Sequence, residues 1–288
     1  MSKTEHSELV RIISQHPWLS EKYSELKNLL FSECENDEHR YLVTTIFSEL
    51  VHIDLHMYKE LIKGVAENIS KTHFSPSTTL IVSMTGDRSA DSGQHVLYEL
   101  KYFLRYFTWT GYTAVNKYNE SHKIFKENGQ QDNHIILVDN FIGSGRTVQT
   151  RIDWIKETFK QKNYRIPNIS VKVALCTQSG FEILKENGVD IYASKIVNDK
   201  LIENLFYSPA IDHYIGMMEY LESKLLQVYK TKKNNTKILP SLGYGKAQVA
   251  LSIETMNTPN NVFPIFWWQF YKDEKERRVL LLRDMEDA

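Results

Sequence analysis

The residues best suited to chemistry in this chain lie between positions 134 and 150, in the sequence HIILVDNFIGSGRTVQT. A carboxylate is followed by a glycine-rich turn, a guanidinium and hydroxyl groups, just as a helical pattern begins. Glycine lets a backbone approach an anion closely, and the N–H groups at a helix start bind phosphate. A carboxylate ahead of the turn accepts hydrogen bonds from sugar hydroxyls, so the spacing predicts a ribose-5-phosphate site. Its candidate residues are Asp139, Gly143, Ser144, Gly145, Arg146 and Thr147.

The residues on either side of this turn indicate the elements that would position it. Ile135 to Val138 is a continuous apolar run, which is typical of a strand buried on both faces in a parallel sheet. Apolar residues between Val148 and Phe159 recur at spacings of three and four, which predicts a helix. Strand, turn and helix start together form the arrangement in which backbone donors converge on a phosphate.

At these residues the chain resembles the phosphoribosyltransferase fold, whose signature is an apolar strand, two acidic residues and a Thr-Gly-Gly-Thr-like loop. Asp139 matches the first acid and residues 144–147 match the loop, but Asn140 replaces the second acid. Gly143 stands where hypoxanthine-type enzymes carry a catalytic carboxylate. The resemblance implies that Asp139 and Asn140 are the catalytic positions, and that Asp139 holds Mg²⁺ if a pyrophosphate ligand is bound. The alternative is an ordinary β–turn–α unit whose glycines only make the turn.

A second loop follows an earlier apolar segment. Thr79 to Met84 predicts the first core strand, residues 85–93 (TGDRSADSG) form a loop, and a helix is expected from 94 to about 107. In phosphoribosyltransferases the loop after the first core strand contacts the pyrophosphate of phosphoribosyl pyrophosphate. The resemblance therefore makes Arg88, Ser92 and Gly93 anion contacts, although a plain polar turn is an equal alternative.

The order of these segments predicts the fold class. Apolar strands near positions 79, 135, 169 and 191 alternate with helical patterns. Such alternation implies right-handed crossovers and a parallel sheet in an α/β fold, the phosphoribosyltransferase-like (type I) arrangement with helices flanking the sheet. Ligands in such sheets bind beyond the carboxyl ends of the strands, which puts the 85–93 and 139–147 loops at one edge.

The flanking regions predict a division into three parts. Residues 1–72 are expected to be a helical N-terminal region, 73–271 the phosphoribosyltransferase-like domain with a small strand-containing C-terminal hood, and 272–288 a charged helical tail. Within the first part, an apolar stripe from Leu42 to Ile69 predicts one long helix over 39–70 that must pack on the core or on a partner.

A carboxyl-terminal pattern extends the resemblance. The sequence Gly-Tyr-Gly at 243–245 precedes Thr-Pro-Asn-Asn at 258–261 and the aromatic run VFPIFWW at 262–268. It is similar to phosphoribosyltransferase-like proteins of bacterial conflict (antiphage) systems, which act beside other components, often an NTPase. Asn260 and Asn261 with a tryptophan, Trp267 or Trp268, could hold a base. Equally, asparagines in a turn and aromatic residues in a core need no ligand.

Composition restricts the class of protein further. A net charge of −1 over 288 residues gives no global attraction for nucleic acid, so such binding would need a local patch such as the lysines of 230–237. Two cysteines without zinc spacing fit a reducing cytosol. We expect a soluble cytoplasmic protein with no membrane segment, because neither a signal-peptide core nor a long apolar run is present.

Three functions follow from these observations. The favoured one is a phosphoribosyltransferase-like effector or sensor of an antiphage defence system that binds a nucleotide or phosphoribosyl pyrophosphate, with protein partners that could include an NTPase. The second is an active transferase or glycohydrolase at ribose C1, in which Mg²⁺ would neutralise a leaving pyrophosphate. The third is a scaffold or nucleic-acid-binding subunit of a multi-protein complex. The base, the activity and the partners are not specified by the sequence.

Overall fold

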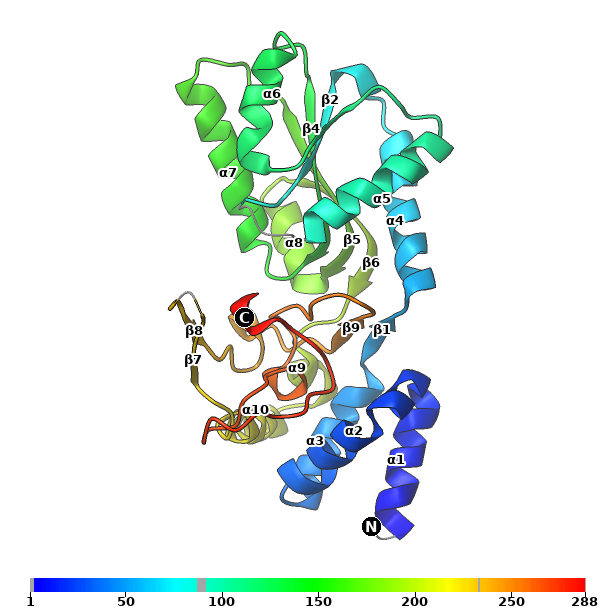
Figure 1. The fold of residues 1–288 in the computed structure, drawn as a ribbon, viewed down its shortest axis with the longest axis vertical. Coiled ribbons are helices and arrows are strands. Elements are labelled where there is room, and N and C mark those ends of the chain that lie inside the picture. The colour runs from blue at the N-terminus through cyan, green and yellow to red at the C-terminus, as the bar shows by residue number, and fades with distance from the viewer. Residues whose placement is uncertain (1–2, 87–91, 233, 288) are drawn as a thin grey trace. The chain divides into compact units, whose positions relative to one another are not determined.

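The computed structural model describes residues 3–86, 92–232 and 234–287 of the chain (Figure 1). The chain forms two compact units: unit 1 comprises Met1–Leu55 with Asn198–Ala288, and unit 2 comprises His56–Val197. Unit 2 is therefore one continuous segment, whereas unit 1 is assembled from both ends of the sequence. The division expected from the sequence, into 1–72, 73–271 and 272–288, has different boundaries and stays a prediction.

Unit 2 is built on a five-stranded, wholly parallel sheet in the order β3-β2-β4-β5-β6. This confirms the predicted α/β class. The strands are β2 (Thr79–Ser83), β3 (Thr113–Val115), β4 (His134–Ile142), β5 (Asn168–Thr177) and β6 (Asp190–Val197). The helices are α4 (Leu55–Ser70), α5 (Ser92–Tyr106), α6 (Ser121–Glu127), α7 (Arg146–Gln161) and α8 (Gln178–Glu186).

Helices cover both faces of this sheet, as the uninterrupted apolar strands require. On one face, α6, α7 and α8 bury side chains such as Phe125, Ile155 and Leu184 against inward residues of the strands. On the other face lie α4 and α5 (Figure 1). The Ser194 hydroxyl of β6 donates to the backbone oxygen of Leu61 in α4 at 2.7 Å, which fixes that helix to the sheet edge.

Unit 1 packs short helices around a core that is rich in aromatic side chains. Its helices are α1 (Lys3–Gln15), α2 (Tyr23–Asn28), α3 (Asp37–Ser48), α9 (Leu201–Leu205) and α10 (Ala210–Glu222). Its strand pairs are β1 (Val51–Ile53) with β9 (Leu251–Ile253), which is parallel, and β7 (Val228–Lys230) with β8 (Thr236–Ile238), which is antiparallel.

The single long helix predicted over 39–70 is wrong. Helix α3 ends at Ser48, residues 51–53 form strand β1, and α4 begins at Leu55. Val51 and Ile53 are β-branched and gain a parallel partner in β9, which outweighs a weak helical preference. The apolar spacing runs on across the break, so the sequence pattern shows no interruption. The break also coincides with the boundary between the two units.

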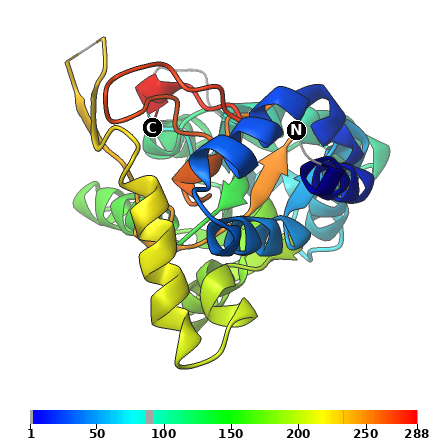
Figure 2. The ribbon, with the colours of Figure 1, turned by 90° about the horizontal axis from the view of Figure 1, so that it is seen from below.

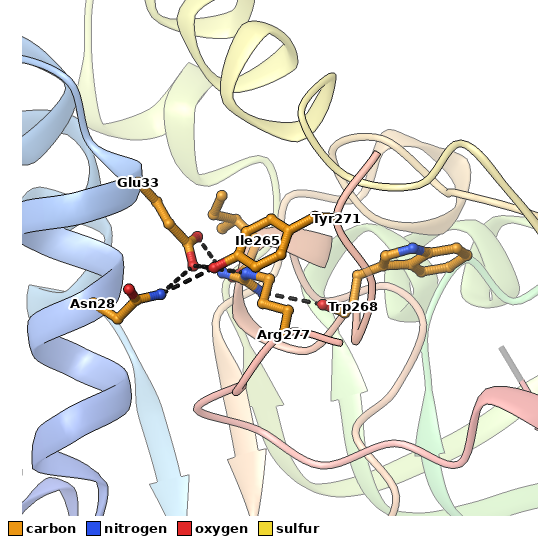
Figure 3. Close-up of polar contacts among 6 residues, drawn as sticks. All are labelled: Asn28, Glu33, Ile265, Trp268, Tyr271 and Arg277. Carbon is orange, nitrogen blue, oxygen red and sulfur yellow. Dashed lines mark hydrogen bonds and ion pairs between the residues drawn. The ribbon is translucent and has the colours of Figure 1, made fainter. Parts of the chain in front are cut away.

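The helix expected in the charged C-terminal segment is also wrong: its described residues hold only the short 3-10 turn Met285–Asp287. Arg277 is buried with 4% exposure and forms the centre of a polar cluster in unit 1 (Figure 3). Its guanidinium donates to both carboxylate oxygens of Glu33, at 2.8 and 2.6 Å, and to the backbone oxygens of Ile265 and Trp268. The tail is therefore a packed part of unit 1 because its arginine satisfies backbone and carboxylate acceptors inside it.

The chain around Lys230 and Lys237 forms a β-hairpin. Helix α10 ends at Glu222, and the chain then forms the β7–β8 hairpin, which Figure 2 shows as an extended two-stranded ribbon. Lys230 and Lys232 are exposed there. Within the described residues, no helix combines the length and the apolar character that crossing a bilayer requires.

Candidate functional site

The strand order of unit 2 defines where a ligand site is expected. Strand β2, the first in sequence, lies between β3 and β4, so the connections that leave β2 and β4 diverge to opposite sides (Figure 1). Open parallel sheets bind ligands beyond the carboxyl ends of strands at such a switch point. Here the two flanking segments are the loop after β2 and the turn after β4, the same two that the sequence singles out.

Asp139 lies within β4, because that strand continues to Ile142 and does not end at Val138 as expected. Its Oδ1 accepts a hydrogen bond from the Ser92 hydroxyl at 3.0 Å and another from the backbone N–H of Asn140 at 2.8 Å. Ser92 is the first residue of α5. The structure thus joins a candidate residue of the first loop to the candidate acid of the second.

The turn after β4 leads directly into α7. Gly145 precedes the helix in a left-handed conformation, with φ of 74° and ψ of −13°, which glycine adopts without steric cost. The N-cap residue of α7 is this glycine, which has no side chain to cap the first turn, and the first intrahelical bond runs from the Gln149 N–H to the Gly145 oxygen. The N–H groups that open a helix have no intrahelical acceptor. Arg146 and Thr147 are exposed beside them, so this helix start is suited to an anion.

The turn between β5 and α8 supports this loop, and the sequence reasoning missed it. The Thr177 hydroxyl donates to the backbone oxygen of Gly143 at 2.9 Å and accepts from the N–H of Gly180 at 3.0 Å. A Cβ atom on Gly180 would lie only 1.8 Å from that same Gly143 oxygen. Gly180 is therefore glycine because the backbone of α8 packs directly on the turn. The spacing of a threonine and a glycine three residues apart is the sequence signal that could have indicated it.

The remaining candidates of the first loop are divided. Arg88 lies outside the described residues. Gly93 is buried, and a Cβ there would lie 2.6 Å from the Ser83 hydroxyl oxygen, so this glycine lets α5 approach the end of β2 closely. Close packing alone therefore accounts for glycine at this position.

A second cation near this loop was not predicted. The Arg151 guanidinium, one turn into α7, lies over the Tyr118 ring at 4.5 Å from its centroid. A Cβ on Gly86, in the loop after β2, would lie 3.2 Å from an Arg151 terminal nitrogen. Arg151 on α7 therefore places a positive charge beside the first loop. It stands four residues after Thr147, on the same face of the helix, which is the spacing that relates the two.

Asn260 and Asn261 belong to unit 1, a different unit from the one that holds the 139–147 turn. Asn261 is buried and its amide donates to the backbone oxygen of Tyr244 at 3.0 Å, while the Tyr244 N–H donates to the Asn260 oxygen at 2.7 Å. Trp267 and Trp268 are fully buried. These contacts favour the alternative in which the asparagines shape a turn and the indoles fill a core.

The acidic residues of the site decide how it could hold a metal ion. Among the described residues, no group of three or more histidines, cysteines or carboxylates is placed to hold one. Mg²⁺ often binds through one or two carboxylates together with the phosphates of its ligand, and Asp139 fits that mode. Nearby, burial and then the carboxylates of Glu99 and Asp139 raise the pKa of the Tyr58 hydroxyl above its usual range. Tyr58 therefore stays neutral beside the acid.

Comparison with solved structures gives distant likenesses. Orotate phosphoribosyltransferase from Aeropyrum pernix is 13% identical with a TM-score of 0.30, covering 48% of this chain and 70% of that one. A hypothetical protein from Neisseria gonorrhoeae with bound ppGpp is 12% identical with a TM-score of 0.33, covering 59% and 97%. The xanthine-guanine-hypoxanthine phosphoribosyltransferase of Helicobacter pylori is 8% identical with a TM-score of 0.30, covering 51% and 86%.

A search of curated protein sequences found no match. A family model, by contrast, matches residues 16–278, which is nearly the whole chain and spans both units. It includes the parallel sheet, the turn after β4 and the Asn-Asn segment of unit 1. The chain therefore belongs to the PRTase-CE family.

Proposed function

We propose that unit 2 binds the 5′-phosphate of a ribose-containing ligand, a nucleotide or phosphoribosyl pyrophosphate, at the start of α7. The observation that supports this most is the combination at one switch point of a helix start whose N-cap is a glycine and an acid held by Ser92. The backbone N–H groups of 143–147 bind the phosphate, with Arg146 and Thr147 adding donors.

Asp139 has a different role in this proposal. Its carboxylate accepts hydrogen bonds from the ribose hydroxyls, and Asn140 contributes a neutral contact at most. Where the ligand carries pyrophosphate, Mg²⁺ enters with the ligand phosphates and Asp139 holds it. Arg151 then neutralises charge from the side of the first loop, since its guanidinium lies beside Gly86.

We propose further that the protein serves as an effector or sensor of a bacterial antiphage defence system, in which it acts with protein partners such as an NTPase. The resemblance of the 243–268 segment to conflict-system proteins supports this role. Gly143 and Asn140 stand where salvage enzymes carry carboxylates, so the proposal favours ligand binding over nucleotide salvage. The phage resistance of cells that carry the gene with its neighbours, compared with cells carrying Asp139→Ala, tests the role. Equal phage plating on both strains would contradict it.

Calorimetry tests the site itself, with ribose-5-phosphate, nucleoside monophosphates and phosphoribosyl pyrophosphate, each with Mg²⁺. A hydrogen bond to a charged group contributes about 1.5–3 kcal/mol, so Asp139→Ala should weaken binding by roughly ten- to a hundredfold. Asp153→Ala is the matched control, because Asp153 is an exposed carboxylate on α7. A folded protein that binds none of these ligands would refute the site.

A turnover assay separates the sensor from the enzyme. Release of pyrophosphate or free base is measured for the wild type and for Asn140→Asp, which restores the pair of acids. We expect negligible wild-type turnover, with stronger Mg²⁺-dependent binding in the variant. Robust wild-type turnover would contradict the sensor role and indicate an active transferase or glycohydrolase.

A further inference from the structure

Helix α5 carries a row of exposed tyrosines that the ribose-phosphate site does not use. Tyr98, Tyr102 and Tyr106 are 74%, 71% and 64% exposed, although tyrosine normally buries much of its ring when it packs in a core. They follow one another at intervals of four residues on the face of α5 that points away from the sheet. The opposite face is buried through Val96, Leu97, Leu100 and Leu104. The row is therefore a surface feature of a helix whose packing is already complete.

Two of the three rings are held in place by their neighbours. The Tyr102 ring meets Phe103 edge to face, with centroids 5.2 Å apart and planes at 83°. The Tyr106 ring meets Phe107 in the same way, at 5.1 Å and 83°. Successive tyrosines are displaced by about 6 Å along the helix axis and turned by about 40° around it. The face thus offers three regularly spaced aromatic rings, and neighbouring rings brace two of them.

Charge on the same face is positive. Lys101 and Arg105 are exposed and stand beside the row, one helical turn apart. The helix has one carboxylate, Glu99, whose side chain is only 21% exposed and forms an ion pair with His95. Aromatic planes with adjacent cations bind single-stranded nucleic acid, because bases stack on the rings and phosphates pair with the cations.

We propose that the outer face of α5 binds single-stranded nucleic acid, with bases stacked on Tyr98, Tyr102 and Tyr106 and phosphates at Lys101 and Arg105. A second copy of the chain is disfavoured as the occupant: a two-fold pairing about Tyr102 would bring Lys101 and Arg105 against their own counterparts, which repel. The surface is sequence-tolerant, since every base has a stacking face. The net charge of −1 does not oppose it, because the cations are local.

The test is fluorescence anisotropy of the full chain with labelled single-stranded oligonucleotides that lack a 5′-phosphate, so that the ribose-phosphate site has no terminal phosphate to bind. Duplex of the same sequence is measured in parallel. We expect preference for the single strand, and each Tyr→Ala change in the row should weaken binding by about five- to a hundredfold. Tyr102→Phe retains the ring and should retain binding. Tyr207→Ala removes a still more exposed tyrosine elsewhere, 84% exposed, and should have no effect.

Salt dependence tests the cations separately. Two phosphate contacts on a single strand give a slope of log affinity against log salt of about −1.4, and Lys101→Gln with Arg105→Gln should bring it near zero. Equal affinity of the wild type and the triple Tyr→Ala variant would overturn the proposal. So would a wild-type dimer that the triple variant converts to monomer with no oligonucleotide bound, because the row would then be a protein interface.

Discussion

Gly180→Ala is the sharpest perturbation of the candidate site, because it changes one methyl group at a residue that contacts no ligand in the proposal. The added Cβ would lie 1.8 Å from the Gly143 oxygen, whereas ordinary contacts begin at 3.4 Å. The backbone of α8 and that of the turn at Gly143 must therefore separate by about 1.6 Å. Both sides of this contact are main chain, so rotation of a side chain cannot relieve it.

The expected magnitude follows from that displacement. Overpacking of this kind costs roughly 1–3 kcal/mol of stability. If the 143–147 turn moves, one or two charge-assisted bonds to phosphate are lost at about 1.5–3 kcal/mol each. Affinity for a nucleoside monophosphate should then fall by at least about tenfold. Thr177→Val is milder, since it keeps the shape and removes only the hydroxyl that donates to the Gly143 oxygen and accepts from the Gly180 N–H, and it should weaken binding by only about fivefold.

The assay is calorimetric titration with the phosphate ligands, accompanied by thermal melts. Gly216→Ala is the matched control: it lies within α10, and no described heavy atom beyond its chain neighbours and the nearby backbone of that helix is within 4 Å of the added Cβ. It should leave binding unchanged and stabilise its helix by about 0.5–1 kcal/mol. Wild-type affinity in both Gly180→Ala and Thr177→Val would refute the view that the turn after β5 holds the phosphate loop.

Two further predictions concern unit 1. Burial raises the pKa of Glu222 to about 7 from 4.5, so the folded state holds its proton more tightly and stability falls as pH rises from 4.5 to 7, then stays level. The free energy of unfolding falls by about 3 kcal/mol over the 2.5 pH units between these two values. Glu222→Gln should abolish this loss, so its urea midpoint should be higher than that of the wild type at pH 8 and similar near pH 4.5. Glu21→Gln, at an exposed carboxylate of unit 1, is the control, and a pH-independent wild-type midpoint between those values would contradict the reasoning. Arg277→Met should cost about 3–5 kcal/mol in chemical unfolding, because it leaves the Glu33 carboxylate buried without its cation. Adding Glu33→Gln should recover part of that loss, and a single variant as stable as wild type would count against the ion pair.

The sequence predicted correctly those features that depend on residues close together in the chain. The apolar runs of β2 and β4 predict strands buried on both faces, and the glycine-rich turn before Arg146 predicts the start of a helix there. The structure confirms the parallel sheet that these patterns predict, because each pattern depends on residues that are neighbours in the chain.

The predictions that were wrong, and the residues that were missed, involve contacts between residues that are distant in the sequence. Strand β1 exists because β9 pairs with it, and nothing around Val51 reveals a partner near position 251. In the sequence alone, Arg277 is one charged residue of a charged tail, and only the structure shows that Glu33 lies beside it. In the sequence alone, Gly180 is a residue at a helix start, and only the structure shows that the Gly143 oxygen packs directly against it. In each case a long-range contact decided the local conformation.

The discontinuity of unit 1 sets an order on how the chain can fold during synthesis. Residues 56–197 are contiguous, so the five-stranded sheet can close as soon as that segment has left the ribosome. Strand β1 must wait for β9, which is made about 200 residues later. Until then the apolar faces of α1 and α3 have no completed core to enter. The N-terminal segment is thus the part of the nascent protein that most needs protection by chaperones, and truncation before β9 should leave a folded unit 2 attached to an aggregation-prone leader.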